Sequence, residues 1–189
     1  MTATKWKVFV EGKADRRFVS TLLTALGVAT VEVESIGGGV SHLRAGTVRN
    51  LLQRSRRDGC KIATVLDADE DVDARQAELD RINDEYDLAI ERSFWLPNDV
   101  DSGCLETLLE EVAVEEHHRV FNCLDQYVEC LDAFDRGYEG PTRKGRIYAY
   151  CEAVGAEKGE EQRDYTNDKH WDLSASSLQP LRAFLDELT

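Results

Sequence analysis

The chain has 189 residues, 42% hydrophobic and 32% charged, which is the mixture of a folded globular protein and not of a disordered or membrane-embedded one. A formal net charge of −14 argues against a protein that captures nucleic acid through a broadly cationic surface. Five widely spaced cysteines with no close pair favour reduced thiols over a zinc site. The N-terminal residues MTATKWKVFVEGK resemble neither a signal peptide nor a spanning segment, so we expect a cytoplasmic protein with no membrane association.

The first half of the chain alternates predicted strands and helices. Apolar or alternating runs predict strands at residues 5–10, 28–36, 61–66 and 88–96. Apolar residues at helical spacing predict the intervening helices at residues 14–26, 40–57 and 72–85. This order is typical of parallel β-α-β units with right-handed crossovers. We therefore expect an α/β fold with an open, mainly parallel sheet of about four strands and helices on both faces.

The pattern changes after Gly103, where only helices are predicted. They cover residues 103–135, 143–154 and 175–188. A charged stretch at residues 155–170 is predicted to be an exposed loop. These features divide the chain into an α/β core, residues 1–112, and a helical C-terminal extension, residues 113–189, packed on that core.

Carboxylates follow two of the predicted strands. Glu11 follows the first strand, and Asp67 and Asp69 follow the third. Ligands bind beyond the carboxyl ends of the strands in an open parallel sheet, and residues two apart on an extended chain project to the same side. We therefore expect these three carboxylates to converge. Such a cluster suits Mg²⁺, which takes oxygen ligands and keeps several waters.

Each of these acids also has an ordinary structural explanation. Loops are polar, and Asp69 or Asp71 could cap the helix that follows. Asp15 could offset the dipole of the first helix, although it lies only four residues after Glu11. A helix cap accounts for one aspartate but not for an acid that ends another strand, which favours a shared site.

The segment of residues 40–57 is basic and contains no acid. Its arginines are Arg44, Arg49, Arg54, Arg56 and Arg57. Two hypotheses stay open, a solvated helix face and a phosphate-binding surface, for which Arg44, Arg49 and Arg56 are the candidates. If these arginines bind phosphate, at least two should border the carboxylate cluster.

Several segments together resemble a known family. The residues VFVEGKADRRF, the glycines at 37–39 and TVLDADED resemble the Toprim domain of topoisomerases, bacterial primases and OLD-type nucleases. The later segments FWLPNDVDSGCLETLLEEV and WDLSASSLQPLRAFLDEL resemble small Toprim-like proteins related to those nucleases. The resemblance implies that Glu11 acts as general acid/base or metal ligand and that Asp67 and Asp69 coordinate Mg²⁺. In the OLD-like branch, Glu106 and Asp15 would add to the metal site.

The function that this resemblance implies is Mg²⁺- or Mn²⁺-dependent phosphoryl transfer, and we expect a nuclease whose partner is DNA or RNA. Two features depart from the nuclease pattern. Only Lys144 and Lys169 are candidates for the lysine that assists catalysis in that branch, and no GxxxxGK[ST] motif marks an ATPase domain. The alternative is a non-catalytic Toprim-like module that binds a nucleotide or a protein partner, which the overall acidity favours. A receiver-like phosphoacceptor domain is a weaker alternative, because the lysine-bearing strand end that it requires is absent.

Overall fold

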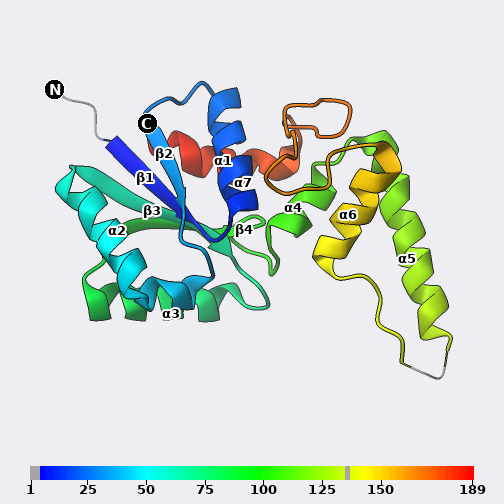
Figure 1. The fold of residues 1–189 in the computed structure, drawn as a ribbon, viewed down its shortest axis with the longest axis horizontal. Helices are drawn as coiled ribbons and strands as arrows, with labels where there is room; N and C mark the ends of the chain where they lie inside the picture. Colours follow the sequence, from blue (N-terminus) through cyan, green and yellow to red (C-terminus); the bar gives the residue numbers. More distant parts are fainter. Residues whose placement is uncertain (1–4, 135–136) are drawn as a thin grey trace.

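A four-stranded parallel sheet forms the centre of the computed structural model, which describes residues 5–134 and 137–189 (Figure 1). The strands are β1 (Lys5–Val10), β2 (Val31–Ser35), β3 (Cys60–Asp67) and β4 (Ile90–Leu96). Their order across the sheet is β2-β1-β3-β4, and every neighbouring pair is parallel. The structure thus confirms the predicted open parallel sheet.

Seven α-helices and three short 3-10 helices surround the strands in the described part of the chain. The α-helices are α1 (Lys13–Ala25), α2 (Gly46–Arg57), α3 (Val72–Tyr86), α4 (Leu105–Glu111), α5 (His118–Asp132), α6 (Arg143–Val154) and α7 (Gln179–Asp186). The 3-10 helices are η1 (Val40–Arg44), η2 (Glu115–His117) and η3 (Ser176–Leu178). None of the described helices combines the length and the apolar character that crossing a membrane requires. The five cysteines are all free thiols, as predicted.

Two predicted helices are interrupted in the structure. The helix expected at residues 40–57 is divided at Ala45, whose extended backbone (ψ 132°) separates η1 from α2. The helix expected at residues 103–135 is divided at Ala113, which forms an isolated antiparallel bridge with Trp171. A backbone that pairs in this way is extended and cannot continue a helix. These interruptions depend on tertiary contacts that helical periodicity does not reveal.

Side chains of the sheet alternate between two hydrophobic cores. Val8 and Val65 are fully buried in one core, together with residues of α1 and of the C-terminal helices. Phe9 and Leu66 are fully buried in the other core, against η1, α2 and α3. This alternation is what the two-residue period of a strand produces when helices cover both faces. Helices on both faces were predicted, and Figure 1 shows them on either side of the strands.

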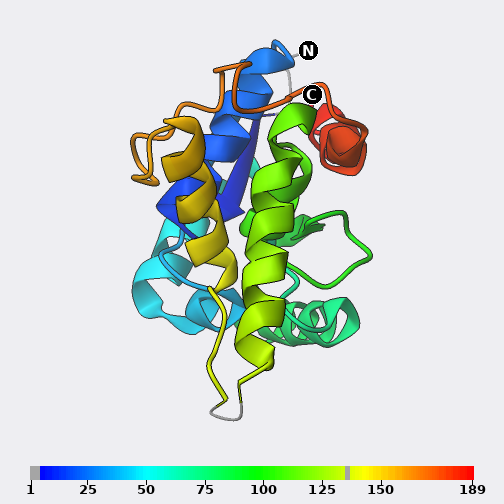
Figure 2. The same ribbon diagram turned by 90° about the vertical axis from the view of Figure 1, so that its right-hand side faces the viewer.

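The helices after α4 pack on this framework. The ring of Phe184 in α7 lies 5.4 Å from that of Phe94 in β4, measured between centroids. Helices α5 and α6 run side by side and extend away from the sheet (Figure 2). Residues of α4 to α7 belong to the same hydrophobic cluster as β1, so the C-terminal part packs directly on the α/β core.

The segment of residues 155–170 contains neither helix nor strand, as predicted, but it is not wholly exposed. Arg163 and Tyr165 are only 2% and 1% exposed. The Tyr165 ring lies edge-on to Phe18 of α1 at 5.1 Å, and the Arg163 guanidinium donates to the Lys158 carbonyl at 3.0 Å. The prediction of an exposed loop therefore holds for most of the segment and misses Arg163 and Tyr165, because two buried side chains within a polar stretch create no periodic pattern.

Candidate metal centre

A cleft of about 820 Å³ opens at the carboxyl ends of β1 and β3 and contains four of the five predicted carboxylates. They are Glu11, Asp15, Asp67 and Glu106. Glu11 directly follows β1 and Asp67 ends β3, while Asp15 and Glu106 lie in the first turns of α1 and α4. Because β1 and β3 are adjacent and parallel, their carboxyl ends bring Glu11 and Asp67 to the same place. We name this feature the carboxylate cleft.

Hydrogen bonds connect Glu11, Asp67 and α4 across the edge of the sheet. The backbone N–H of Asp67 donates to Glu11 Oε1 at 3.2 Å. The backbone N–H of Leu105 donates to Asp67 Oδ1 at 3.0 Å, at the beginning of α4. Each carboxylate is therefore oriented through one oxygen. The second oxygen of each accepts no hydrogen bond from the described residues and remains available for a ligand.

The glycine-rich turn at residues 37–39 holds the Glu11 backbone from the other side. The backbone N–H groups of Gly37 and Gly38 donate to the Glu11 carbonyl at 2.9 and 3.0 Å. Gly37 has φ of 78°, a left-handed conformation that glycine adopts without strain. At Gly39, an added Cβ would lie 3.4 Å from Glu11 Oε2. The turn therefore brings backbone close to the carboxylate without blocking it.

Asp15 is the most deeply buried acid of the cleft, only 7% exposed. Its Oδ2 accepts a hydrogen bond from the Gly12 N–H at 3.0 Å. Its Oδ1 is buried and has no hydrogen-bond partner among the described residues. Burying a neutral polar oxygen without a partner costs roughly 2–7 kcal/mol, and an ionised one costs more. A cation in the cleft would compensate this oxygen, which is the observation that best fits a metal.

Burial and mutual repulsion raise the pKa values of Glu11, Asp15 and Asp67. Burial raises the pKa of Asp67 to about 8, and the charges of Asp15 and Glu11 add to this effect. Burial likewise raises the pKa of Glu11 to about 7, against the opposing hydrogen bond from the Asp67 N–H. The pKa of Asp15 is also raised, chiefly by burial and further by the charge of Glu106. Acids that repel one another in this way are stabilised by a divalent cation.

Asp69 does not line the carboxylate cleft itself but lies beside it, close enough for its charge to raise the pKa of Glu11. Strand β3 ends at Asp67, and Asp69 has a left-handed backbone with φ of 53°, so strand alternation no longer sets its direction. Its carboxylate forms an ion pair with Arg75 of α3 and lines a neighbouring cleft of about 600 Å³. Asp71 is the N-cap of α3, and its side chain accepts from the Ala74 N–H at 3.0 Å.

The candidate phosphate-binding arginines Arg44, Arg49 and Arg56 do not line the carboxylate cleft. Arg44 Nη2 lies 3.6 Å from a carboxylate oxygen of Glu78, and the Arg49 guanidinium lies 4.4 Å from the centre of the Tyr86 ring. Arg56 Nη1 donates to the Asp87 carbonyl at 2.7 Å. All three tie η1 and α2 to α3 and its C-terminal turn. Their placement gives no support to the phosphate-binding hypothesis, because α2 lies over a face of the sheet and not at its carboxyl edge.

The cations that do line the cleft come from α1 and α6. They are Lys13, Arg16, Arg143 and Lys144. Of the two lysines considered from the sequence, Lys144 borders the cleft and Lys169 does not. The Lys144 ammonium forms an ion pair with Glu160, which also accepts from the Tyr148 hydroxyl at 2.9 Å.

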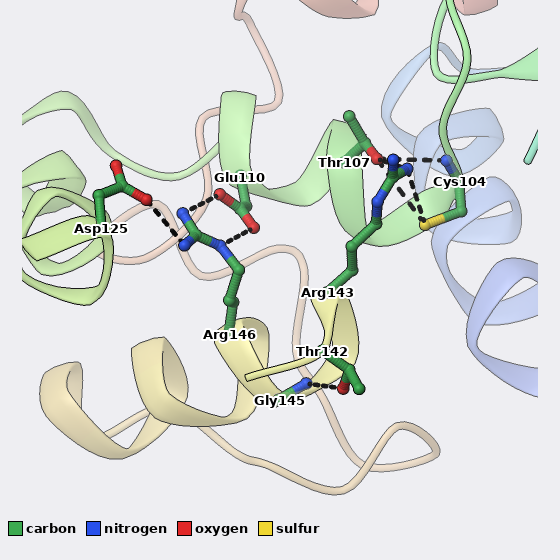
Figure 3. A network of polar contacts seen from close by, with 8 residues as sticks. All are labelled: Cys104, Thr107, Glu110, Asp125, Thr142, Arg143, Gly145 and Arg146. Atoms are coloured by element: carbon green, nitrogen blue, oxygen red, sulfur yellow. Dashed lines mark hydrogen bonds and ion pairs between the residues drawn. The ribbon is translucent and has the colours of Figure 1, made fainter. Parts of the chain in front are cut away.

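Arg143 stands where the carboxylate cleft meets the neighbouring cleft, because it lines both. Its Nη1 donates to Thr107 Oγ1 at 2.8 Å and lies 3.9 Å from Cys104 Sγ (Figure 3). Arg146, one turn along α6, bonds Glu110 of α4 at 2.7 and 2.9 Å and Asp125 of α5 at 2.8 Å (Figure 3). These ion pairs fix α6 beside α4. The sequence signal that could have found Arg143 and Lys144 is the N-cap Thr142, which places both in the first turn of a helix.

The donor set of the cleft fits a hard cation. Within residues 5–134 and 137–189, no three acidic, histidine or cysteine side chains already stand in the arrangement of a metal site. Mg²⁺ does not require three such ligands, because it is commonly held by one or two carboxylates while waters and substrate phosphates complete its shell. Carboxylate oxygens are the donors that line the cleft, and they suit Mg²⁺ or Mn²⁺ better than zinc. The carboxylate oxygens of the cleft thus have the chemistry that a hard divalent cation prefers, and Asp15 Oδ1 is an additional oxygen without a hydrogen-bond partner among the described residues.

Comparison with known proteins gives one match. No curated protein and no solved structure matches the chain. One family model, described as "Protein of unknown function (DUF3226)", matches residues 5–189. This match covers nearly the whole chain, and the protein therefore belongs to the DUF3226 family.

Proposed function

We propose that this protein is a cytoplasmic Mg²⁺- or Mn²⁺-dependent phosphodiester hydrolase, a nuclease that acts on DNA or RNA. The observation that carries the proposal is the convergence of Glu11, Asp15, Asp67 and Glu106 from four separate elements into one cleft. Polar loops and helix caps account for single acids, but they do not account for four that gather in one cleft, where burial and repulsion raise the pKa values of Glu11, Asp15 and Asp67. The resemblance of the same residues to the Toprim domain supports the same conclusion.

In this proposal Glu11 and Asp67 hold the ion through the oxygens that accept no protein hydrogen bond. Asp15 and Glu106 supply oxygens from the first turns of α1 and α4. With a divalent ion held by these residues, the site would gain charge neutralisation at the phosphate oxygens and assistance in activating the nucleophile. Glu11 also suits a general base, because a carboxyl with a pKa of about 7 can take a proton from water near neutral pH.

The basic side chains of the cleft complete the site. Arg143 is held by Thr107 with its guanidinium at the rim, where it can donate to phosphate oxygens. Lys144 is paired with Glu160 and would exchange this carboxylate for a substrate phosphate. A protein with a net charge of −14 would repel the phosphates of a nucleic acid, and these cations reduce that repulsion locally. Phosphates approach an acidic site when metal ions and local basic groups compensate it.

A second candidate function is a non-catalytic module that binds a nucleotide or a protein partner through the same cleft. The ion pair between Asp69 and Arg75 favours it, because an internal cation already neutralises one of the acids assigned to the metal. Both candidates expect metal or phosphate binding. Only the enzyme hypothesis predicts cleavage of a nucleic-acid substrate.

The test is incubation of the purified protein with single- and double-stranded DNA and RNA, with Mg²⁺, Mn²⁺ or EDTA. We expect cleavage that requires the metal and is lost in Glu11→Gln, which keeps the shape of the side chain but cannot act as a base. The matched control is Glu91→Gln, because Glu91 lies at the amino end of β4 and pairs only with Lys61 among the described residues. Metal binding without cleavage of any substrate would favour the non-catalytic module. No binding of either metal would contradict the enzyme and would also favour the non-catalytic module.

A further inference from the structure

A groove of about 640 Å³ runs along the outer side of α1 and joins the carboxylate cleft. Lys13 and Arg16 line both the groove and the cleft, so the two are continuous. The groove continues past Arg17 and the hydroxyl groups of Ser20, Thr21 and Thr24. These positions recur every three or four residues and therefore share one side of the helix. From Lys13 to Thr24 the helix rises about 16 Å, which spans several nucleotides of an extended strand.

The two arginines of this groove are held in place without being neutralised. Arg16 Nε donates to the Val33 carbonyl at 3.2 Å, and Arg17 Nε donates to the carbonyl of Arg163. Neither guanidinium forms an ion pair with a carboxylate of the described residues. Each arginine is thus anchored through one nitrogen while its terminal nitrogens keep their donors for a ligand. A planar guanidinium with free donors matches a phosphate group.

Lys13 is neutralised only by a weak ion pair. Its ammonium lies 2.5 Å from Glu161 Oε1, and the two side chains are 72% and 60% exposed. An ion pair this exposed contributes little stability, so a phosphate can displace the carboxylate. Asp164 also lines the groove, but its carboxylate accepts hydrogen bonds from the N–H and hydroxyl of Thr166 at 2.9 and 2.6 Å. With three basic and two acidic side chains, the groove has a small cationic excess in a chain whose net charge is −14.

We propose that this α1 groove binds the sugar-phosphate backbone of a single-stranded nucleic acid and leads the strand into the carboxylate cleft. The inference rests on the proposed function, because the strand that enters the cleft is its substrate. The basic groups form one row along one helix, which fits one backbone better than the two backbones of a duplex. Hydrogen bonds to phosphate carry no sequence information, so binding is insensitive to base sequence. Glu161 competes with the substrate for Lys13 in this arrangement.

The experiment measures binding of a fluorescently labelled oligothymidine by anisotropy, at several salt concentrations, with Ca²⁺ in place of Mg²⁺. The variants are Arg16→Gln, Arg17→Gln and Glu161→Gln, and the matched control is Arg54→Gln on the exposed side of α2. We expect each groove arginine variant to weaken binding about five- to tenfold. Removing one phosphate-binding cation should also lower the slope of log K against log salt by about 0.7. Arg54→Gln should bind as the wild type does.

Glu161→Gln should change the affinity for oligothymidine in the opposite direction. A merely structural role of these residues does not predict tighter binding, so this variant separates the two explanations. Removing this carboxylate frees Lys13 for a phosphate, so we expect binding to become about two- to fivefold tighter, because one more cation then neutralises the backbone. Wild-type affinity in Arg16→Gln and Arg17→Gln would overturn the proposal, as would a preference for duplex over single strand or no binding of oligothymidine by the wild type. Circular dichroism confirms that each variant is folded. If Arg17→Gln is not folded, Arg16→Gln and Glu161→Gln decide the outcome.

Measuring Mn²⁺ binding on the same samples distinguishes an error in the groove proposal from an error in the metal-site proposal. If the groove variants bind Mn²⁺ and oligothymidine as the wild type does, the proposal that the α1 groove binds nucleic acid is refuted. The proposal that the carboxylate cleft binds metal is then unaffected. Loss of oligothymidine binding in the arginine variants with unchanged Mn²⁺ binding would support the groove. A wild-type protein that binds oligothymidine through these arginines but binds no Mn²⁺ would support the groove and contradict the proposed enzyme.

Discussion

Replacing Asp67 by asparagine tests the carboxylate cleft through protein stability. Asparagine keeps the shape of the side chain and can still accept the hydrogen bond from the Leu105 N–H, so the change removes little besides the charge. Burial and the charges of Asp15 and Glu11 raise the pKa of Asp67 to about 8. Between the pKa of the unfolded chain, near 3.8, and the folded value of about 8, the folded protein binds a proton that the unfolded chain has released. Stability therefore falls as the pH rises through this window.

The size of the effect follows from the same values. A displacement from 3.8 to about 8, at about 1.4 kcal/mol for each pH unit, corresponds to a ceiling on the order of 5 kcal/mol. Water that enters the open cleft screens part of this repulsion, so we expect Asp67→Asn to gain about 2 kcal/mol at pH 8 in EDTA. In a chain of this size the gain corresponds to a melting temperature roughly 4–8 °C higher. Near pH 4 the two proteins should differ little, because Asp67 is then protonated in the folded state.

The assay is thermal and urea unfolding of the wild type, Asp67→Asn and the control Glu91→Gln, at pH 4 and pH 8, with EDTA or excess Mg²⁺. Mg²⁺ should stabilise the wild type and the control, since a ligand that binds only the folded state raises stability. It should not stabilise Asp67→Asn. An Asp67→Asn protein that is less stable than the wild type in EDTA at pH 8, and that Mg²⁺ still stabilises, would show that Asp67 is a structural residue and not a metal ligand.

Three further predictions concern the remaining residues of the site. The metal-dependent cleavage rate should rise with pH through a value below 7, because burial raises the pKa of Glu11 to about 7 in the metal-free protein and a bound cation would lower it. Glu11→Gln should lower kcat about 100-fold or more in single-turnover assays. Lys144→Gln should lower kcat at least tenfold, as expected for a charge that contacts phosphate, whereas Lys169→Gln should leave kcat unchanged. Equal kcat values in the two variants would show that Lys144 has no catalytic role. Gly12→Ala should destabilise the protein by about 1–3 kcal/mol in urea unfolding, because the new Cβ would lie 2.9 Å from Asp15 Oδ2. An unchanged unfolding midpoint would mean that the Asp15 side chain can move away from the new Cβ.

The sheet could be predicted because its signals are local. Strands such as β1 and β3 are short apolar runs, and amphipathic helices follow them, so the parallel order and both covered faces follow from the sequence. The positions of Glu11 and Asp67 at the ends of β1 and β3 follow from the same local signals. Their proximity in the cleft required only that the two strands be adjacent, as they are.

Other features depend on tertiary contacts that no local pattern encodes. Arg143 and Lys144 reach the cleft only because Arg146 bonds Glu110 and Asp125 and thereby fixes α6 beside α4. Asp69 does not line the cleft, because its backbone is left-handed two residues after the end of β3. The alternation of side-chain directions along a strand therefore does not extend to it. The arginines at 44, 49 and 56 form a basic stretch in the sequence, but the packing of α2 against α3 directs them to local partners.

Binding of a divalent cation in the carboxylate cleft is tested most directly by titrating the protein with Mn²⁺ and following electron paramagnetic resonance, in which bound and free Mn²⁺ give different signals. We expect saturable binding by the wild type and by Glu91→Gln, and strongly weakened binding by Asp67→Asn and Glu11→Gln. Mg²⁺ should compete for the same site. Binding that is equal in all four proteins, or absent from the wild type, would contradict the claim that the carboxylate cleft holds a divalent cation.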